Sequence, residues 1–296
     1  MNLAVHDIRH NLGRFLLTSV GLGLLLGVVL SMIGIYRGLV AEALTLVRTP
    51  AADLWVVETG TRGPFAEGSR IPGDTREAVA RLAGVVATGS VTFQSFETEH
   101  RGRKLRLQVV GFEPDRLGGP NTLVEGRDLV RRFELVVDVK TGLALGERIV
   151  LGGDPFTVVG LTRGAVSSGG DPVVWMTLRD SQVLQFRLAP APARREAARG
   201  AATQTPDTVN AVLARVAPSV PVDGVAAEAR RWKHLSALTQ VDQETILTRS
   251  VVEKARQQIG LFTTVLLTVS TVIIALIIYT MTMDKLKEIA TLKLIG

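Results

Sequence analysis

The chain has 296 residues, of which 46% are hydrophobic, and its mean hydropathy of +0.27 is above the usual value for a water-soluble protein. That length is sufficient for one large domain or two small ones. The absence of cysteine excludes a disulfide scaffold, a thiolate metal site and a cysteine nucleophile. Aromatic residues make up 5%, too few for a surface on which single-stranded nucleic acid stacks. The composition therefore favours a membrane protein.

Residues 1–14 are predicted to form a short amphipathic helix on the cytoplasmic face of the membrane. Leu3, Ile8 and Leu12 stand there among charged and polar residues, a pattern typical of a helix that lies in the interface.

Residues 15–36 contain no ionisable side chain except that of Tyr36. This run of 22 residues exceeds the roughly 20 that cross the hydrocarbon core, so we predict a first transmembrane helix. A cleaved secretory signal is the alternative, but its apolar region is only roughly 7–15 residues long. Small residues recur at every fourth position of the run and predict a helix-packing face, formed by Ser19, Gly23, Gly27 and Ser31.

A second apolar run covers residues 257–283, between Arg256 and Asp284, and predicts a second transmembrane helix. Basic residues flank the runs at both ends of the chain, so the positive-inside rule places both termini in the cytoplasm of a bacterial cell, with the chain in its cytoplasmic (inner) membrane. Residues 37–256 then lie outside the cytoplasm, in the periplasm where the cell has one. Their 29 basic and 25 acidic residues are scattered and form no basic patch, which argues against nucleic acid as a partner.

Residues 37–256 are predicted to form a mixed α/β domain, whose first helix continues from the first span as far as Pro50. A second helix is expected at Thr75–Leu82. Strands are expected where apolar runs are bounded by turn residues, at Asp53–Glu58, Val91–Glu99, Lys104–Phe112, Glu134–Val139, Arg148–Leu151, Phe156–Leu161 and Val173–Leu178.

The last part of this domain is less regular in sequence. Residues 189–206 are rich in Ala, Pro and Arg and predict an exposed linker. Asp207 is expected to cap a helix over Thr208–Ala217, and a last strand is expected from Val222. Residues 232–283 contain no proline and a single glycine, so the second membrane helix is expected to begin outside the lipid as a stalk.

Motifs that carry chemistry are missing. The sequence has no G-x-x-x-x-G-K-[ST] phosphate loop and no G-x-S-x-G nucleophile elbow. His6 and His10 have the spacing of a zinc-protease helix, but Asp7 replaces the usual glutamate and Arg9 would repel a cation. We therefore predict no catalytic residue, no metal site and no cofactor in this chain.

Three stretches resemble the permease subunits of FtsX-like ABC transporters, whose branches include the MacB-like, lipoprotein-exporting and DevC-like systems. The entry reads NLAVHDIRHNLGRFLLTSVGLGLLLGVVL, and the core, from Leu123, contains VEGRDL and LALGERIVLGGDPFTVVGL. The exit reads MTMDKLKEIATLKLIG and is similar to the family element E-[KR]-x-x-E-I-[AG]-x-L-[KR]-x-[IL]-G. The resemblance implies an α+β outer domain of the MacB-like periplasmic core type between two transmembrane helices. Family members continue with two more membrane helices, so it also implies that the sequence stops short of the full pattern.

The resemblance makes residues 284–296 an incomplete coupling helix that docks on a separate cytoplasmic ABC ATPase, which binds ATP and magnesium. An apolar stripe of Ile289, Leu292 and Ile295 fits such docking; a basic anchor beside the membrane, which needs only the lysines, is the alternative. The candidate coupling residues are Asp284, Lys285, Lys287, Glu288, Ile289, Leu292 and Lys293. Further implied partners are a second permease subunit, identical or different, membrane lipid and a periplasmic adaptor.

By this resemblance the chain is a permease subunit that passes the work of ATP hydrolysis to its outer domain and exports a lipid, glycolipid, peptide or drug. The alternative is a two-span sensor whose outer domain binds a ligand. A membrane-anchored hydrolase is a third reading, without a catalytic constellation behind it. The residues that follow Gly296 separate the first two: further apolar runs favour the permease, and a soluble signalling module favours the sensor.

Overall fold

The computed structural model describes residues 12–61, 63, 68–167, 169–191, 195 and 207–295. The chain divides into two compact units: Met1–Arg37 with Val252–Gly296, and Gly38–Val251. The predicted linker of residues 189–206 and the predicted surface helix of residues 1–14 lie largely outside the described residues.

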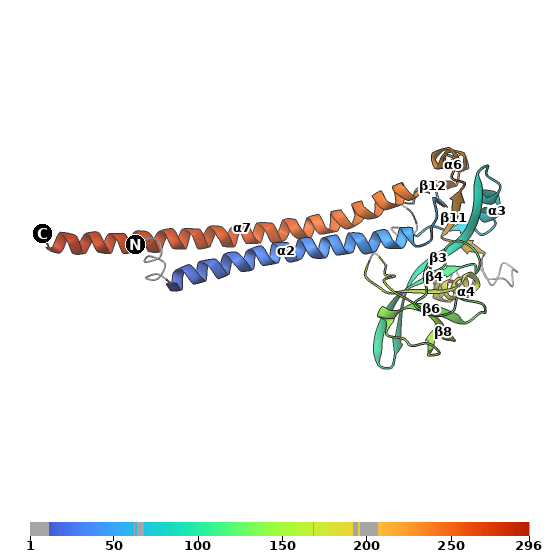
Figure 1. The fold of residues 1–296 in the computed structure, drawn as a ribbon, viewed down its shortest axis with the longest axis horizontal. Coiled ribbons are helices and arrows are strands. Elements are labelled where there is room, and N and C mark those ends of the chain that lie inside the picture. The colour runs from blue at the N-terminus through green and yellow to red at the C-terminus, as the bar shows by residue number, and fades with distance from the viewer. Residues whose placement is uncertain are drawn as a thin grey trace. The chain divides into compact units, whose positions relative to one another are not determined.

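Two long helices make up the described part of the first unit and continue into the second. They are α2, Leu12–Arg48, and α7, Gln240–Ile295 (Figure 1). The end of α2 at Arg48 confirms that the helix runs to the residues just before Pro50. In the part of the chain that the structure describes, no helix combines the length and apolar character needed to cross a membrane. The two predicted spans stay predictions.

The second unit is built on one ten-stranded sheet with the strand order β12-β1-β11-β3-β4-β9-β6-β8-β5, in which β7 also pairs with β8. A separate two-stranded ribbon joins β2, Ile71–Pro72, to β10, Thr208–Val209. The strands of the large sheet are β1 Leu54–Glu58, β3 Val85–His100, β4 Arg103–Phe112, β5 Glu125–Gly126, β6 Glu134–Asp138, β7 Arg148–Leu151, β8 Asp154–Thr162, β9 Val173–Thr177, β11 Ala211–Val216 and β12 Leu235–Thr239.

All seven predicted strands are confirmed, and those expected at Val91–Glu99 and Lys104–Phe112 pair as the hairpin β3–β4. Its two turn residues, Arg101 and Gly102, have φ values of 50° and 73°, the conformation that matches the twist of the two strands. β3 begins at Val85, six residues before the predicted start at Val91, because its first part pairs with β11 and not with β4.

Short helices cover one face of the sheet in two places (Figure 1). They are α3 Thr75–Ala80, α4 Leu178–Leu188 and α6 Val222–Ala229, and a 3-10 turn spans Val139–Thr141. Val79 of α3 and Val225 of α6 belong to one buried cluster, and Leu184 of α4 belongs to a second. A third cluster lies on the opposite face, because side chains alternate along each strand; it includes Trp55 and Trp175.

Two predictions for neighbouring segments are wrong. The helix expected at Thr208–Ala217 is β10 followed by β11, a central strand between β1 and β3. A short apolar run that is buried on both faces does not reveal its period, so strand and helix cannot be distinguished from it. The strand expected from Val222 is α6, which places Val225, Ala226 and Ala229 against the sheet. The last strand is β12, and α7 follows it directly from Gln240, before the apolar run of residues 257–283 begins.

Candidate functional site

The junction where α2 and α7 meet the sheet is the candidate functional site. α2 leads into β1, and β12 leads into α7. β1 and β12 are antiparallel neighbours in which Leu54 lies opposite Thr239, and the amide of Gln240 donates to the carbonyl of Asp53 at 3.0 Å. Both long helices therefore leave the sheet from the same end, on adjacent strands.

A two-point ion pair joins the end of α2 to the start of α7. The Nε atom of Arg48 donates to Oε1 of Glu244 at 2.8 Å, and its Nη2 atom donates to Oε2 at 3.2 Å. These hydrogen bonds, with the charge of the guanidinium, lower the pKa of Glu244 and raise that of Arg48. Such a pair fixes orientation as well as distance, so the two helix ends are held in one geometry although they are 196 residues apart.

The first turn of α7 is held by a reciprocal cap. Thr239 Oγ1 accepts from the amide of Asp242 at 3.2 Å, and Asp242 Oδ2 accepts from the amide of Thr239 at 3.0 Å. Each side chain satisfies a backbone donor that the helix start leaves open. Arg230, just after α6, donates to the carbonyl of Ala237 at 2.8 Å and to Asp242 at 3.2 Å. The start of α7 is thus tied to α6 as well as to the sheet.

Gln243, one turn into α7, is fully buried, and its amide has no hydrogen-bond partner in the described part of the chain. It packs against Gly63, which has a φ of 92°. A Cβ atom at position 63 would lie 2.3 Å from Nε2 of Gln243, so any other residue there would displace the Gln243 side chain as well as adopt an unfavourable φ. Leu247, one turn further along, is also buried.

The end of α2 is anchored by the backbone of its exit turn. Ala51 has a φ of 48°, and its carbonyl accepts two hydrogen bonds from the guanidinium of Arg215, at 3.1 and 3.0 Å. The carboxylate of Asp53 accepts from the amide of Val216 at 2.8 Å. Both partners belong to β11, so α2 is fixed to two strands at once.

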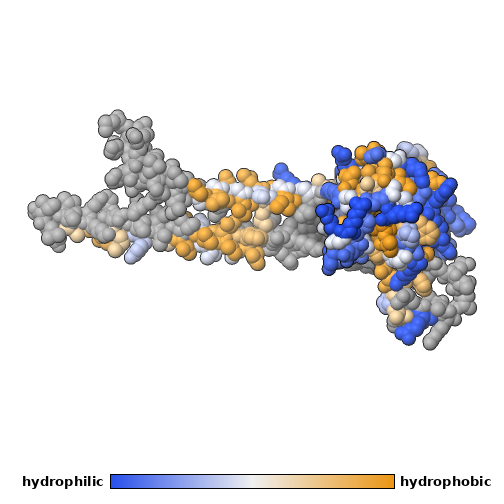
Figure 2. All heavy atoms as spheres, turned by 90° about the horizontal axis from the view of Figure 1, so that it is seen from below, coloured by the Kyte–Doolittle hydropathy of each residue, from blue (hydrophilic) through white to orange (hydrophobic). Residues whose placement is uncertain are grey.

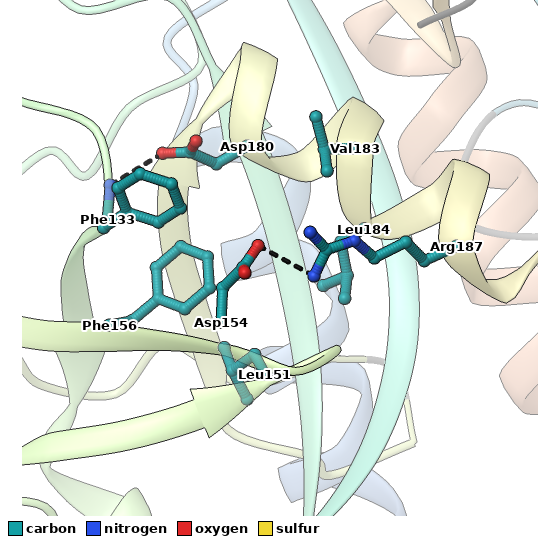
Figure 3. Close-up of a pocket in the computed structure, with 8 residues that line it drawn as sticks. All are labelled: Phe133, Leu151, Asp154, Phe156, Asp180, Val183, Leu184 and Arg187. Atoms are coloured by element: carbon teal, nitrogen blue, oxygen red, sulfur yellow. Dashed lines mark hydrogen bonds and ion pairs between the residues drawn. The ribbon is translucent and has the colours of Figure 1, made fainter.

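A second cluster of side chains packs along α4, with Asp180 near the start of the helix and Arg187 near its end (Figure 3). The buried carboxylate of Asp180 accepts from Nε of Arg132 and from the amide of Phe133, at 2.8 and 2.9 Å. Phe133 has a φ of 63°, and its ring lies 5.5 Å from that of Phe156. The space between these side chains has no room for a water molecule. These side chains fill the space between α4 and the segment before β6 and hold that segment in place, so they do not form a ligand site.

Glu134, the first residue of β6, fixes the same segment from its other side. Its carboxylate is paired with the guanidinium of Arg127 through two hydrogen bonds, at 2.9 and 2.5 Å. It also accepts from the amides of Val130 and Arg131, at 3.0 and 3.1 Å. Because all these donors favour the charged form, the pKa of Glu134 is lowered to about 2.

The sequence-predicted site residues lie in the first unit. Gly23, Gly27 and Ser31 are exposed on α2, and no described atom lies within 4 Å of a Cβ placed at either glycine. The side chain of Ser19 is outside the description. The candidate coupling residues lie near the end of α7, and their side chains are outside the description as well: Asp284, Lys285, Lys287, Glu288, Ile289, Leu292 and Lys293.

The histidine pair of residues 6–10 lies outside the described residues. Among those that are described, no three His, Asp or Glu side chains are grouped so as to hold a metal ion. The sequence pattern missed the Arg48–Glu244 pair, because nothing in a single sequence links two charges so far apart. The helix start at Thr239 did carry a signal, a threonine followed three residues later by an acid.

Comparison with known proteins identifies the family. Residues 15–232 match the model of the MacB-like periplasmic core domain, so the chain belongs to this family, which occurs in ABC transporter permeases. Two uncharacterized ABC transporter permeases of Mycobacterium tuberculosis, Rv0072 and Rv2563, are 27% and 24% identical over 190 and 187 residues. Each alignment covers 63% of this chain and 53% of the relative. The chain thus spans about half the length of the curated relatives it matches.

Among solved structures, the chain matches the periplasmic region of MacB from Actinobacillus actinomycetemcomitans, with a TM-score of 0.43 and 9% identity over 65% of this chain and 90% of that one. The extracellular domain of the noncanonic ABC-type transporter YknZ from Gram-positive bacteria has a TM-score of 0.41 and 10% identity over 64% of this chain and 99% of that one.

Proposed function

We propose that the chain is the permease subunit of an ABC transporter in which a separate cytoplasmic ATPase moves the outer domain. The observation that carries this proposal is the junction. Both long helices enter neighbouring strands at one end of the sheet, and the Arg48–Glu244 pair joins them. A displacement of α7 would then pass directly to the sheet, because no residue separates β12 from α7.

Membrane insertion of residues 15–36 and 257–283, with both termini in the cytoplasm, is the first part of the proposal. The described surface of the two long helices is largely apolar (Figure 2). Lipid is the cover that so much exposed apolar surface requires. The exposed apolar residues include Val20, Leu24, Leu26, Leu30, Ile33 and Ile35 of α2, and Leu261, Val265, Leu267, Val272, Ile274 and Ile278 of α7.

The partners follow from the two ends of this arrangement. Residues 284–296 would dock on the ATPase, where ATP and magnesium bind, and the chain itself would catalyse no reaction. A second permease subunit would pack on the face of Gly23 and Gly27, which is open to close approach by another helix. The outer domain would then drive export of a lipid, glycolipid, peptide or drug, alone or with a periplasmic adaptor.

A pull-down from the native cells tests the ATPase partnership. The detergent-solubilised protein, as the full gene product, is compared with a variant in which Ile289 and Leu292 are both changed to Asp. We expect the native protein to recover an ABC ATPase and the variant to lose it, because two charges in an apolar docking stripe prevent its burial. The matched control changes Val124 and Val130, two exposed apolar residues of the outer domain, to Asp; it adds the same two charges and leaves residues 284–296 intact.

A different result would replace the proposal. If well-folded native protein recovers a kinase or a receptor component and no ATPase, the chain is a two-span sensor.

A further inference from the structure

Two hollows lie beside the end of α2, one on each side of Pro120 and Asn121. Each has a volume of about 210 Å³, and both are lined by these two residues. We call them together the Pro120 groove. Its first half is bounded by α2, by the end of β8 and by Trp175 of β9; its second half is bounded by the exit turn of α2 and by residues 115–119.

The wall of the first half is rich in neutral hydrogen-bonding groups. Thr45, Thr49, Thr122 and Thr162 line it, together with the amide of Asn121 and the indole of Trp175. Thr45 and Thr49 donate their hydroxyl protons to backbone carbonyls of α2, at 3.0 and 2.7 Å. Their oxygen atoms therefore keep free lone pairs and can accept hydrogen bonds from a ligand.

Thr162 gives an independent indication of a polar ligand. The residue is 3% exposed, and its hydroxyl has no hydrogen-bond partner in the part of the chain that the structure describes. A buried hydroxyl without a partner is unfavourable, and such groups in native proteins need an explanation. A bound hydroxyl or amide in the groove would supply the missing partner.

The second half of the groove contains strained backbone. Ala51 and Asp115 both line it and both have left-handed φ values, 48° and 65°. Alanine rarely adopts this conformation, and strain of this kind concentrates at functional sites. The loop from Asp115 packs closely on the sheet at Gly119. A Cβ atom there would come within 2.6 Å of the ring of Phe112.

The net charge of the groove is small. Two acids, Asp115 and Asp128, and two arginines, Arg116 and Arg215, line the second half, and Arg163 is the charged residue among the described ones that line the first. The groove therefore combines nearly balanced charge with neutral donors, acceptors and an aromatic ring. Those groups recognise a hydroxyl-bearing head group through its oxygens and its C–H faces.

We propose that the Pro120 groove binds the uncharged, hydroxyl-bearing head group of an amphipathic molecule. The helix that supplies Thr45 and Thr49 to the groove also contains the apolar run that ends at Tyr36, which is why we assign an amphipathic ligand and not a fully polar one. The transport meaning of this site rests on the proposed function; the binding itself does not, and is measured without an ATPase.

Fluorine NMR of the full chain in phosphatidylcholine nanodiscs tests the binding. The protein contains three tryptophans, which are replaced by 5-fluorotryptophan, and the Trp175→Phe variant assigns the Trp175 signal. The probe is octyl glucoside below its micelle concentration, with octyl phosphate and octyltrimethylammonium as matched amphipaths. We expect a saturable shift of the Trp175 signal with the glucoside alone, and no shift of Trp232.

Equal, non-saturating shifts with all three amphipaths would mean partition of the tail only and would overturn the proposal. A preference for octyl phosphate would overturn it as well, in favour of an anionic ligand.

The Thr162→Val variant then tests the unpaired hydroxyl. Valine keeps the shape of threonine, so we expect glucoside affinity to fall about three- to tenfold while the thermal midpoint stays the same or rises. Thr157→Val, on the same strand outside the groove, is the control and should leave affinity unchanged. Unchanged affinity in Thr162→Val would overturn the assignment of that hydroxyl. If the Trp175 signal does not shift but the pull-down recovers an ABC ATPase, the groove proposal is wrong and the permease proposal stands. If the Trp175 signal shifts but no ATPase is recovered, the ligand site stands and the proposed ATPase partnership is wrong.

Discussion

Glu134 is the residue at which charge and fold stability are most directly linked. Its carboxylate accepts hydrogen bonds from Arg127 and from two backbone amides, and its pKa is lowered from 4.5 to about 2. A lowered pKa means that the stabilising contribution of the charge is fully present above the unfolded-state pKa of 4.5 and is lost as the pH falls through the folded-state pKa of about 2.

The Glu134→Gln substitution removes this contribution. We expect the free energy of unfolding to fall by about 1–2 kcal/mol at pH 6. The difference from the native protein should shrink at pH 3, because the carboxyl group of the unfolded chain is protonated there while the native carboxylate is still largely charged. Urea unfolding at the two pH values measures it. Glu125→Gln, on the exposed edge strand β5, should show neither effect, and an equal loss at both pH values would contradict the linkage.

Gly63 and Gly60 form a natural pair for separating backbone strain from side-chain contact. Both have positive φ, 92° and 88°, but a Cβ at Gly63 would meet the amide of Gln243 whereas a Cβ at Gly60 would meet open space. We expect Gly60→Ala to cost about 1 kcal/mol of stability and Gly63→Ala to cost about 1–3 kcal/mol more, because Gln243 is buried and must move. Thermal unfolding compares the two, and equal losses would exclude the contact with Gln243 as the cause.

At the scale of elements, the Arg48–Glu244 pair is the connection between α2 and α7 that mutation can address most cleanly. Reversing one charge places two like charges within hydrogen-bonding distance. The measurement is how much the ATP hydrolysis rate of the partner ATPase rises when it is assembled with this chain. We expect Glu244→Arg to reduce that rise severalfold, and the exchange of both residues, Arg48→Glu with Glu244→Arg, to restore most of it.

The control for this exchange is Arg106→Glu, which breaks an ion pair with Asp171 elsewhere in the domain. Full stimulation in the Glu244→Arg variant would mean that the sheet pairing of β1 and β12 alone carries the movement.

Elements with a clear period or clear boundaries could be predicted from the sequence. The alternating β4, the β7–β8 pair with its Gly-Gly-Asp-Pro turn, and the uninterrupted α7 are of this kind. β11 could not, because a strand buried on both faces and a buried helix leave the same short apolar pattern. α6 could not be predicted either, because its eight residues make only about two helical turns, too few to show a clear helical period. The junction needed the sheet order, which brings β12 beside β1 across more than 170 residues.

At the scale of the whole molecule, the absence of cysteine makes the topology directly measurable. Single cysteines are introduced at Val124 in the sheet domain and at Ala290 near the end of α7, both of which are exposed positions. We expect a membrane-impermeant maleimide to label Val124→Cys in intact spheroplasts and Ala290→Cys only after lysis. The native protein is the blank, and labelling of both variants in intact cells would contradict cytoplasmic placement of residues 284–296.

The pairing of Leu54 with Thr239 places the first and last strands of the sheet domain side by side. Because the sheet domain starts and ends on paired neighbouring strands, residues 38–251 behave as a cassette inserted into a helical hairpin. Exchanging that cassette for another domain with adjacent ends would leave the spacing of the two helices unchanged. Such an exchange would change the outer domain and leave the sequences of both helices as they are.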